Sequence, residues 1–152
     1  MPALLWLYCA GNWSNSGTYT AGGNTVTLNG ANQTVSGATT FYNLSKVVTS
    51  ADTLTFAAGS TTSVAAGGKL TLTGAPGNLL RLRSATPGTE WFLNVGAGVA
   101  PAANYVDVQD SNAGGGQTIY AYYSTDSLRN TYTAALAEWY ISTGRLDEHP
   151  FG

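Results

Sequence analysis

The chain has 152 residues, of which only 9 % are charged, and its six basic and eight acidic side chains leave a net charge of −2. This charge excludes the basic surface that attracts nucleic acids or anionic membranes. Thr (21), Gly (19), Ser (12) and Asn (11) supply 63 of the 152 positions, but 9 Tyr, 4 Trp and 4 Phe are also present. Because disordered chains are poor in aromatic and β-branched residues, we expect a folded β-protein with a real core.

The chain starts with the apolar run MPALLWLYCA. This run is too short for a membrane span and lacks the basic residues that open a signal peptide. We expect Leu4, Leu5, Trp6 and Leu7 to pack as an end strand that forms a cap or an interface. The alternative is that Met1 begins a fragment of a longer protein. The single cysteine, Cys9, excludes an internal disulfide and a cysteine-based metal site, and its role stays open.

Short alternating segments separated by turn residues fill the middle of the chain. Within segments such as TLTF, KLTLTG and LLRLRS, Leu and Phe fall on one side and Thr, Lys or Arg on the other, which is the period of a β-strand. Turn residues such as Asn29-Gly30, Gly67-Gly68 and Pro76-Gly77 lie between them. The predicted strands are 17–20, 25–28, 33–36, 41–48, 53–57, 63–65, 69–73, 79–84, 91–95, 105–109 and 118–122.

Two architectures are compatible with the segment NTVTLNGANQTVSG at residues 24–37. An Asn-Gly pair between alternating segments is a strong hairpin signal, which would give an antiparallel sandwich or meander. However, TVTL at 25, TLTF at 53 and LTLT at 70 are irregular copies of one unit, and such repetition indicates a solenoid. We therefore predict a β-solenoid over residues 1–128 and keep the antiparallel fold as the alternative.

The tail carries a different pattern. In YTAALAEWYIST, the residues Tyr132, Leu136, Trp139 and Tyr140 fall on one face of a helix, together with Ala135. We expect residues 129–152 to form a helical cap and tail that cover the end of the stack. The alternative is that this helical face docks on another chain.

The phrases GNWSNSGTYTAGGNTVTLNGANQTVSGATTFYNL, APGNLLRLRSATPGTEWFLNV, YVDVQDSNA and IYAYYSTDS resemble repeat-built bacterial surface and secreted proteins that contain right-handed parallel β-helix segments. The likeness covers roughly residues 10–128 and concerns pattern, not a catalytic motif. It implies that residues 1–128 form a right-handed parallel β-helix whose turns stack Val, Leu, Ile and Phe inside and place Thr, Ser and Asn outside. It also implies export to the cell surface or the medium.

Few residues offer chemistry. The only histidine is His149, close to the C-terminus, so we expect no histidine-based triad, no His/Cys metal site and no cofactor. A polysaccharide lyase or glycosidase on a β-helix would need clustered carboxylates with basic residues. Asp107 and Asp110, near Arg81 and Arg83, are weak candidates for that site or for Ca²⁺. The plainer interpretation is solvated outward charges and an ion pair between neighbouring turns.

Aromatic residues concentrate toward the C-terminal end. Alternation places Tyr120 and Tyr122 on one face, where they could form a cap core, an interface or a sugar-binding surface. Our prediction is a non-catalytic extracellular or cell-surface structural module, scaffold- or adhesin-like, that assembles end to end into filaments. Its expected partners are other copies, neighbouring domains of a longer surface protein or glycans, not nucleic acid or a membrane. The alternative is a carbohydrate-binding or lyase-like β-helix.

Overall fold

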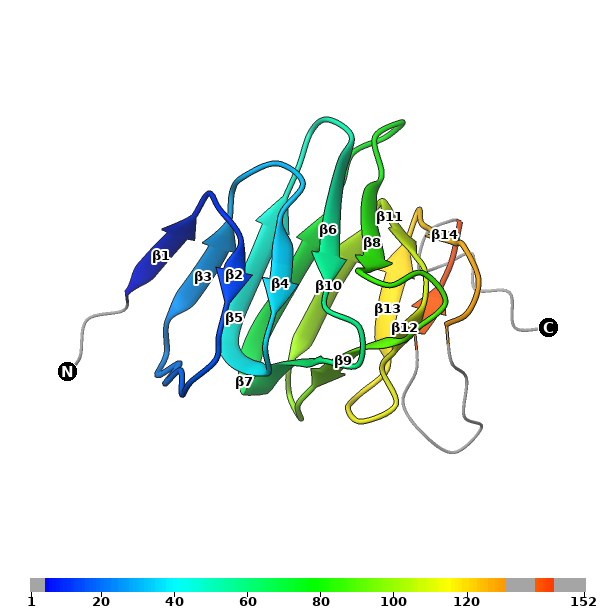
Figure 1. Ribbon diagram of the computed structural model, residues 1–152. Coiled ribbons are helices and arrows are strands. Elements are labelled where there is room, and N and C mark those ends of the chain that lie inside the picture. The colour runs from blue at the N-terminus through cyan, green and yellow to red at the C-terminus, as the bar shows by residue number, and fades with distance from the viewer. Residues whose placement is uncertain (1–4, 131–138, 144–152) are drawn as a thin grey trace.

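The computed structural model describes residues 5–130 and 139–143, and all regular structure in these ranges is β-strand (Figure 1). The strands in chain order are β1 (Trp6–Cys9), β2 (Trp13–Ser14), β3 (Thr25–Leu28), β4 (Thr34–Ser36), β5 (Thr39–Val47), β6 (Asp52–Phe56), β7 (Thr61–Thr73), β8 (Leu80–Ser84), β9 (Trp91–Val95), β10 (Ala100–Asn104), β11 (Val106–Val108), β12 (Ser111–Asn112), β13 (Ile119–Tyr122), β14 (Thr125–Asp126) and β15 (Trp139–Ile141).

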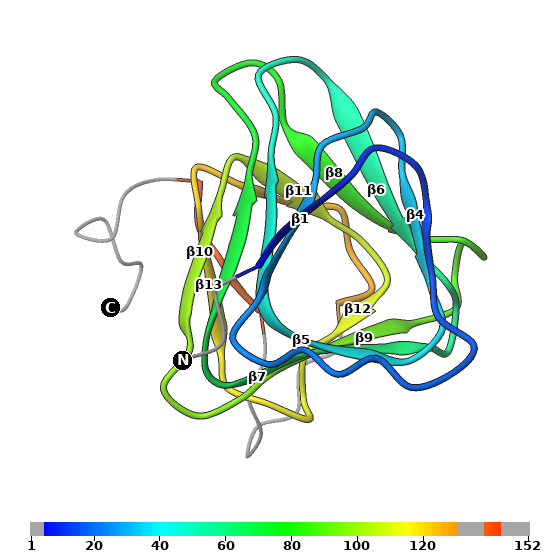
Figure 2. The ribbon, with the colours of Figure 1, turned by 90° about the vertical axis from the view of Figure 1, so that its left-hand side faces the viewer.

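All named strands pair in parallel and form two sheets. The larger sheet has nine strands, with the order β1-β3-β5-β7-β10-β13-β15 and with β9 and β12 attached beside β7. The smaller sheet has the order β14-β11-β8-β6-β4-β2. Strands that are neighbours in a sheet come from successive turns of the chain, and the view along the stack shows these turns winding around one interior (Figure 2). This arrangement is consistent with a parallel β-solenoid.

The larger sheet bends, so that the stack has three faces with a roughly triangular outline (Figure 2). The first face consists of β1, β3, residues 43–47 of β5, residues 69–73 of β7, β10, β13 and β15. The second face is the smaller sheet. The third face comprises residues 39–41 of β5, residues 61–64 of β7, β9 and β12. The bend in β5 coincides with a shift of register between Phe41 and Asn43.

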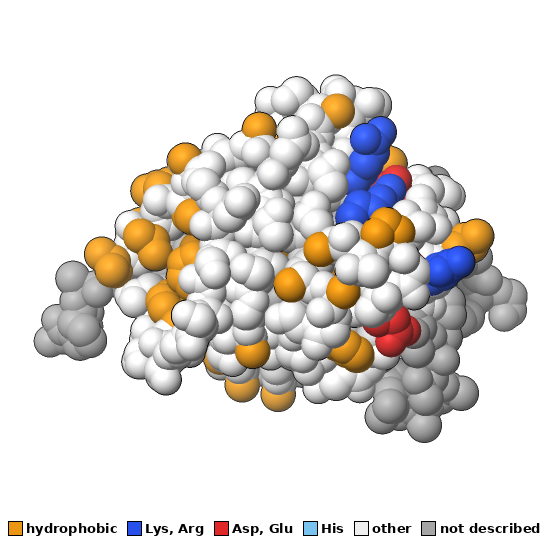
Figure 3. Space-filling model, in the orientation of Figure 1, with side chains coloured by type: hydrophobic (Ala, Val, Ile, Leu, Met, Phe, Trp, Pro, Cys, Tyr) orange, Lys and Arg blue, Asp and Glu red, His pale blue; other side chains and the backbone are white. Residues whose placement is uncertain are grey.

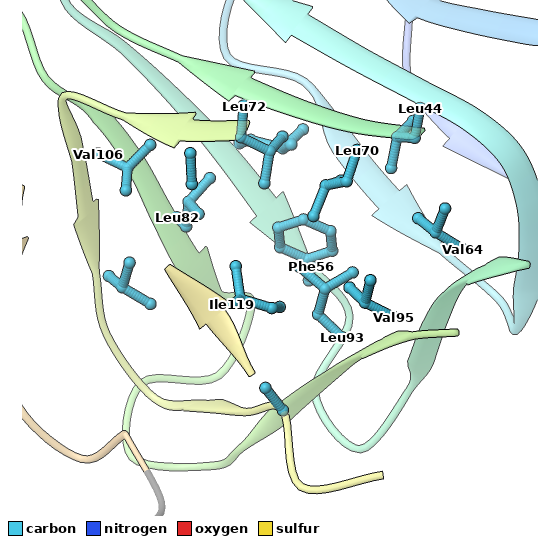
Figure 4. Packing of buried hydrophobic residues seen from close by; sticks show 14 of the residues in the cluster. Leu44, Phe56, Val64, Leu70, Leu72, Leu82, Leu93, Val95, Val106 and Ile119 are labelled. Carbon is cyan, nitrogen blue, oxygen red and sulfur yellow. The ribbon is translucent and has the colours of Figure 1, made fainter. Parts of the chain in front are cut away.

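The core lies inside the winding chain and is built by strict alternation. In β6 and β9 every second residue is buried, and the same pattern recurs in β3, β8 and β11. The parallel register then stacks equivalent residues of successive turns; one such column runs through Val26, Leu44 and Leu70. Side chains from all three faces meet in this interior (Figure 4). Among them, the rings of Phe56 and Trp91 stack with 4.0 Å between their centroids.

The expectation of stacked parallel strands is confirmed at the level of two all-parallel sheets. The Asn29-Gly30 pair joins β3 of the larger sheet to β4 of the smaller one, so the two strands do not pair with each other as a hairpin would require. Gly30 is needed at this corner because a Cβ there would lie 1.9 Å from the carbonyl oxygen of Ala10 in the preceding turn. The corner is thus specified by close approach between turns.

The described part of the tail differs from the helical prediction. Trp139 and Tyr140 lie in strand β15, which pairs with β13 through Ile119↔Trp139 and Tyr120↔Tyr140. A strand places Trp139 over the interior column of Ile119, where it is 2 % exposed. Burial of this large ring outweighs the weak local preference for a helix. The other residues of the predicted helix face, Tyr132 and Leu136, lie outside the described residues.

Candidate functional site

The end of the stack at β1 and β2, which we call the open end, exposes apolar side chains. Leu7 is in register with Val26, a core residue that is 0 % exposed, yet Leu7 itself is 39 % exposed. Leu5, Trp6 and Tyr8 are more exposed still. The apolar start forms the edge strand β1 of the larger sheet, and its side chains are not covered by the described residues. Leu4 lies outside those residues.

The backbone of β1 is also open on one side. The amides of Thr25 and Asn29 donate to the carbonyl oxygens of Leu5 and Cys9, both at 3.0 Å. In a parallel ladder the polar groups of alternate residues point to opposite sides, so those of Trp6 and Tyr8 point away from β3. No strand among the described residues pairs with that edge of β1. The open end thus has unpaired backbone N–H and C=O groups as well as exposed apolar side chains. Both features favour pairing with another strand.

Three aromatic rings pack against one another next to the open end. Trp13 packs edge-on against Tyr19, with 5.1 Å between centroids, and both contact Phe41. The indole Nε1 of Trp13 donates to Thr39 Oγ1 at 3.0 Å. These contacts join the first turn to Phe41 and Thr39 in β5.

The outer surface of the first face carries a groove of about 260 Å³. Four residues in register form one wall, because Trp6 pairs with Thr25, Thr25 with Asn43 and Asn43 with Lys69. The Asn43 side-chain amide donates to Thr25 Oγ1 at 3.0 Å, which fixes its orientation. The remaining lining residues are Gly23, Leu44, Ser45 and Thr71.

Three tyrosines gather on the same face near its other end. Tyr120 and Tyr122 stack with 6.4 Å between centroids, and Tyr120 lies 5.7 Å from the ring of Tyr140. The expectation that Tyr120 and Tyr122 share one face is met by this contact. Burial raises the pKa of the Tyr122 phenol above 10.0, and the neighbouring phenols of Tyr120 and Tyr140 raise it further. Trp139, beneath this cluster, points inward and donates from Nε1 to Ser111 Oγ at 2.7 Å.

The charged candidates occupy the second face. Arg81 and Arg83 point outward, between the buried Leu80 and Leu82. Arg83 forms an ion pair with Asp107 of the next turn, with 2.6 Å between Nη2 and Oδ2. On the face drawn in Figure 3, charged side chains appear only toward the C-terminal end.

The two carboxylates proposed for a metal have separate partners. Asp107 also accepts a hydrogen bond from the Ser127 hydroxyl, in addition to its ion pair with Arg83. Asp110 is buried, and its Oδ2 accepts from the Gly88 amide at 3.0 Å, while Oδ1 has no hydrogen-bond partner among the described residues. Within residues 5–130 and 139–143, no group of three or more His, Cys, Asp or Glu gathers where it could hold a metal ion. These two carboxylates thus form contacts between neighbouring turns.

The two remaining candidates are Cys9 and His149. Cys9 is a half-buried thiol that donates to the carbonyl oxygen of Gly11 at 3.3 Å. His149 lies outside the described residues. The described ranges contain no helix with the length and apolarity needed to cross a membrane.

Comparisons with protein-family models, curated proteins and solved structures found no match to the chain. Two features of the site were missed by the sequence reasoning. The groove joins residues of four turns, and unequal turn lengths hide their register. Tyr8 was left out of the expected interface, although its alternation with Leu7 and Cys9 signals an outward position beside Trp6.

Proposed function

We propose that the chain is a non-catalytic structural module of an extracellular or cell-surface protein, built as a right-handed parallel β-helix that associates end to end. The observation that carries the proposal is the exposure of Leu7 at a position whose equivalent in the next turn, Val26, is fully buried. A column that is apolar throughout and exposed at its last member gains stability when another apolar residue covers it. The unpaired edge of β1 adds backbone hydrogen bonds to that gain.

The register specifies which residues would meet. The interior column of Leu7 continues through Val26, Leu44 and Leu70, and it reaches Ile119 and Trp139 in the last turns. A second copy stacked in continuing register would therefore place its Leu7 beyond Trp139. Its Cys9 would lie beyond Ile141. Such a contact is heterologous and open, so it leads to filaments instead of closed dimers.

The distribution of charged residues along the chain also supports end-to-end association. The first 45 residues contain no Asp, Glu, Lys or Arg. Charged residues commonly protect exposed strand edges from association, and the open end lacks them. The low charge and the abundance of hydroxyl and amide side chains fit a secreted or surface location.

Sedimentation velocity over a range of concentrations, with electron microscopy, tests the association. We expect concentration-dependent filaments for the natural chain and a monomer for Leu7→Asn. The matched control is Val47→Asn, which changes an exposed apolar strand residue away from the open end and keeps the assembly. Monomers of the natural chain at every concentration would overturn the proposal.

A disulfide test checks the order of the stack. Adjacent strands place paired Cα atoms about 4.8 Å apart, within the range that a disulfide bridges. Ile141→Cys should therefore link to the natural Cys9 of another copy under oxidising conditions. Tyr140→Cys, one residue away on the outer side, should not. Crosslinking of the unmodified chain through Cys9 alone would instead mean that two open ends face each other, which contradicts end-to-end stacking.

A further inference from the structure

The groove on the first face has a composition that association of the ends does not explain. Its wall runs from the indole of Trp6, which is 61 % exposed, through Thr25 and Asn43 to the exposed Lys69. Ser45 and Thr71, in register with each other, lie alongside on the neighbouring outward column. Along the wall of the groove, one aromatic ring is thus followed by hydroxyl and amide groups and then by a cation.

This order of groups fits a sugar chain. A pyranose ring has an apolar face of C–H groups that packs on an aromatic ring, and its hydroxyl rim exchanges hydrogen bonds with hydroxyl and amide side chains. The hydroxyl groups of Thr25, Ser45 and Thr71 can each donate or accept a hydrogen bond. They can therefore pair with sugar hydroxyl groups that act either as acceptors or as donors. The bond from Asn43 to Thr25 holds the amide in place before a ligand arrives, which lowers the entropic cost of binding.

The charge of the groove indicates which class of sugar chain the groove suits as a ligand. The strands of the first face contain no Asp or Glu, and of their two lysines Lys46 is buried inside, so Lys69 is the one outward charge on them. Among the described residues, the ion pairs involve Lys46 and Arg83, and none involves Lys69. A lone cation beside hydroxyl groups suits one carboxylate per few sugar units. It does not suit a polyphosphate chain, whose binding needs several cations.

The same face offers a second aromatic surface farther along the stack. Tyr120 pairs with Tyr140 on the outer side of β13 and β15, and Tyr122 stacks on Tyr120. Five steps between adjacent strands separate β1 from β13, a distance of about 24 Å at the usual spacing of 4.8 Å. Aromatic rings at both ends of a polar, nearly uncharged face suit a polymer that lies along the stack, rather than a single sugar.

We propose that the outer surface of the first face binds an acidic polysaccharide, with Trp6 stacking on a sugar ring and Lys69 pairing with a carboxylate. This inference does not depend on the end-to-end association. Leu7, which serves the association, points to the interior, whereas Trp6 and Lys69 point outward.

Calorimetric titration with oligogalacturonates of increasing length in which only one carboxylate per few sugar units is free, and with the same oligomers after complete methyl esterification, tests the proposal. Esterification removes the carboxylate charge and leaves the sugar backbone. We expect affinity for the acidic form to rise with length, because longer chains reach more of the face. Lys69→Met should weaken the acidic form by about fivefold and leave the esterified form unchanged. Trp6→Ala should weaken both forms by about tenfold.

Arg81→Met is the matched control, since it removes an exposed cation from the second face. If it reduces affinity as much as Lys69→Met does, or if neither form of the oligomer binds, the proposal is overturned. Two further measurements separate this result from the association of ends. Leu7→Asn should abolish filaments and keep binding, whereas Lys69→Met should keep filaments.

Discussion

Lys46 and Asp52 form an ion pair inside the stack, with 3.1 Å between Nζ and Oδ2 and with the Lys46 side chain fully buried. Lys46 occupies the interior column in which Leu72 stands one turn later. Its ammonium also donates to Gly30 O at 2.8 Å and to Gln33 Oε1 at 3.0 Å. Asp52 Oδ1 accepts from the amides of Asn32 and Thr53. The pair therefore ties the corners of successive turns together.

We expect the two members of this pair to be strongly coupled in stability. Lys46→Met leaves a buried carboxylate without its cation, and Asp52→Asn leaves a buried ammonium without its anion, so each should cost about 3–5 kcal/mol. The double variant removes both charges and should cost at least about 2 kcal/mol less than the sum of the single variants. Urea unfolding of the four proteins measures this. Additive losses would show that the pair contributes nothing as a pair.

The interior columns predict a large effect at a single leucine. Leu70 is 0 % exposed and lies between Leu44 of the preceding turn and strand β10 of the following turn. Leu70→Ala should reduce the free energy of unfolding by about 2–5 kcal/mol, because the removed methyl groups leave a cavity. Leu128→Ala, at a residue that is 71 % exposed, should change it by less than about 0.5 kcal/mol. Similar losses at both sites would contradict a core confined to the interior of the stack.

Glycine at the corners is required where turns approach each other. A Cβ on Gly68 would lie 1.9 Å from the carbonyl oxygen of Tyr42, a backbone atom that cannot move without shifting the neighbouring turn. Gly68→Ala should therefore destabilise the protein by at least about 2 kcal/mol. Gly17→Ala is the control, because its Cβ would meet nothing within 4 Å. Thermal unfolding of both variants decides whether close approach, and not loss of chain flexibility, sets the requirement.

Local alternation predicted much of the architecture because it depends only on which side of a strand a residue takes. Strands 25–28 and 91–95 were predicted with their observed bounds, and the outward positions of Arg81 and Arg83 followed from Leu80 and Leu82. The strand β10 was missed, because APAAN contains no alternation of apolar and polar residues. Its strand state comes from the ladders with β7 and β13 on either side.

The groove depends on register between turns, which local patterns do not contain. Trp6, Thr25, Asn43 and Lys69 are in register although they stand 19, 18 and 26 residues apart. The loops that set these spacings differ in length, so no constant repeat reveals the column. Lys46 was hidden for a related reason, since its burial depends on Asp52 at a corner of the same turn and on Gln33 at a corner of the previous turn. Contacts between turns, more than patterns within strands, determine what this surface and this core can do.

The tyrosine cluster makes the stability sensitive to alkaline pH. The pKa of Tyr122 is raised above its ordinary value of 10.0, first by burial and then by the phenols of Tyr120 and Tyr140. The folded state thus holds this proton more tightly than the unfolded state does. Its contribution to stability is complete below pH 10.0 and is lost as the pH rises through the raised pKa.

Tyr122→Phe removes the proton that can be lost and keeps the ring. We therefore expect this variant to lose less stability than the natural chain between about pH 9 and about pH 12. Urea unfolding at a series of pH values measures the difference. Tyr8→Phe, which removes an exposed phenol outside the cluster, is the control. If Tyr122→Phe and the natural chain lose stability in parallel over this range, the phenols of the cluster do not interact in the way their placement indicates.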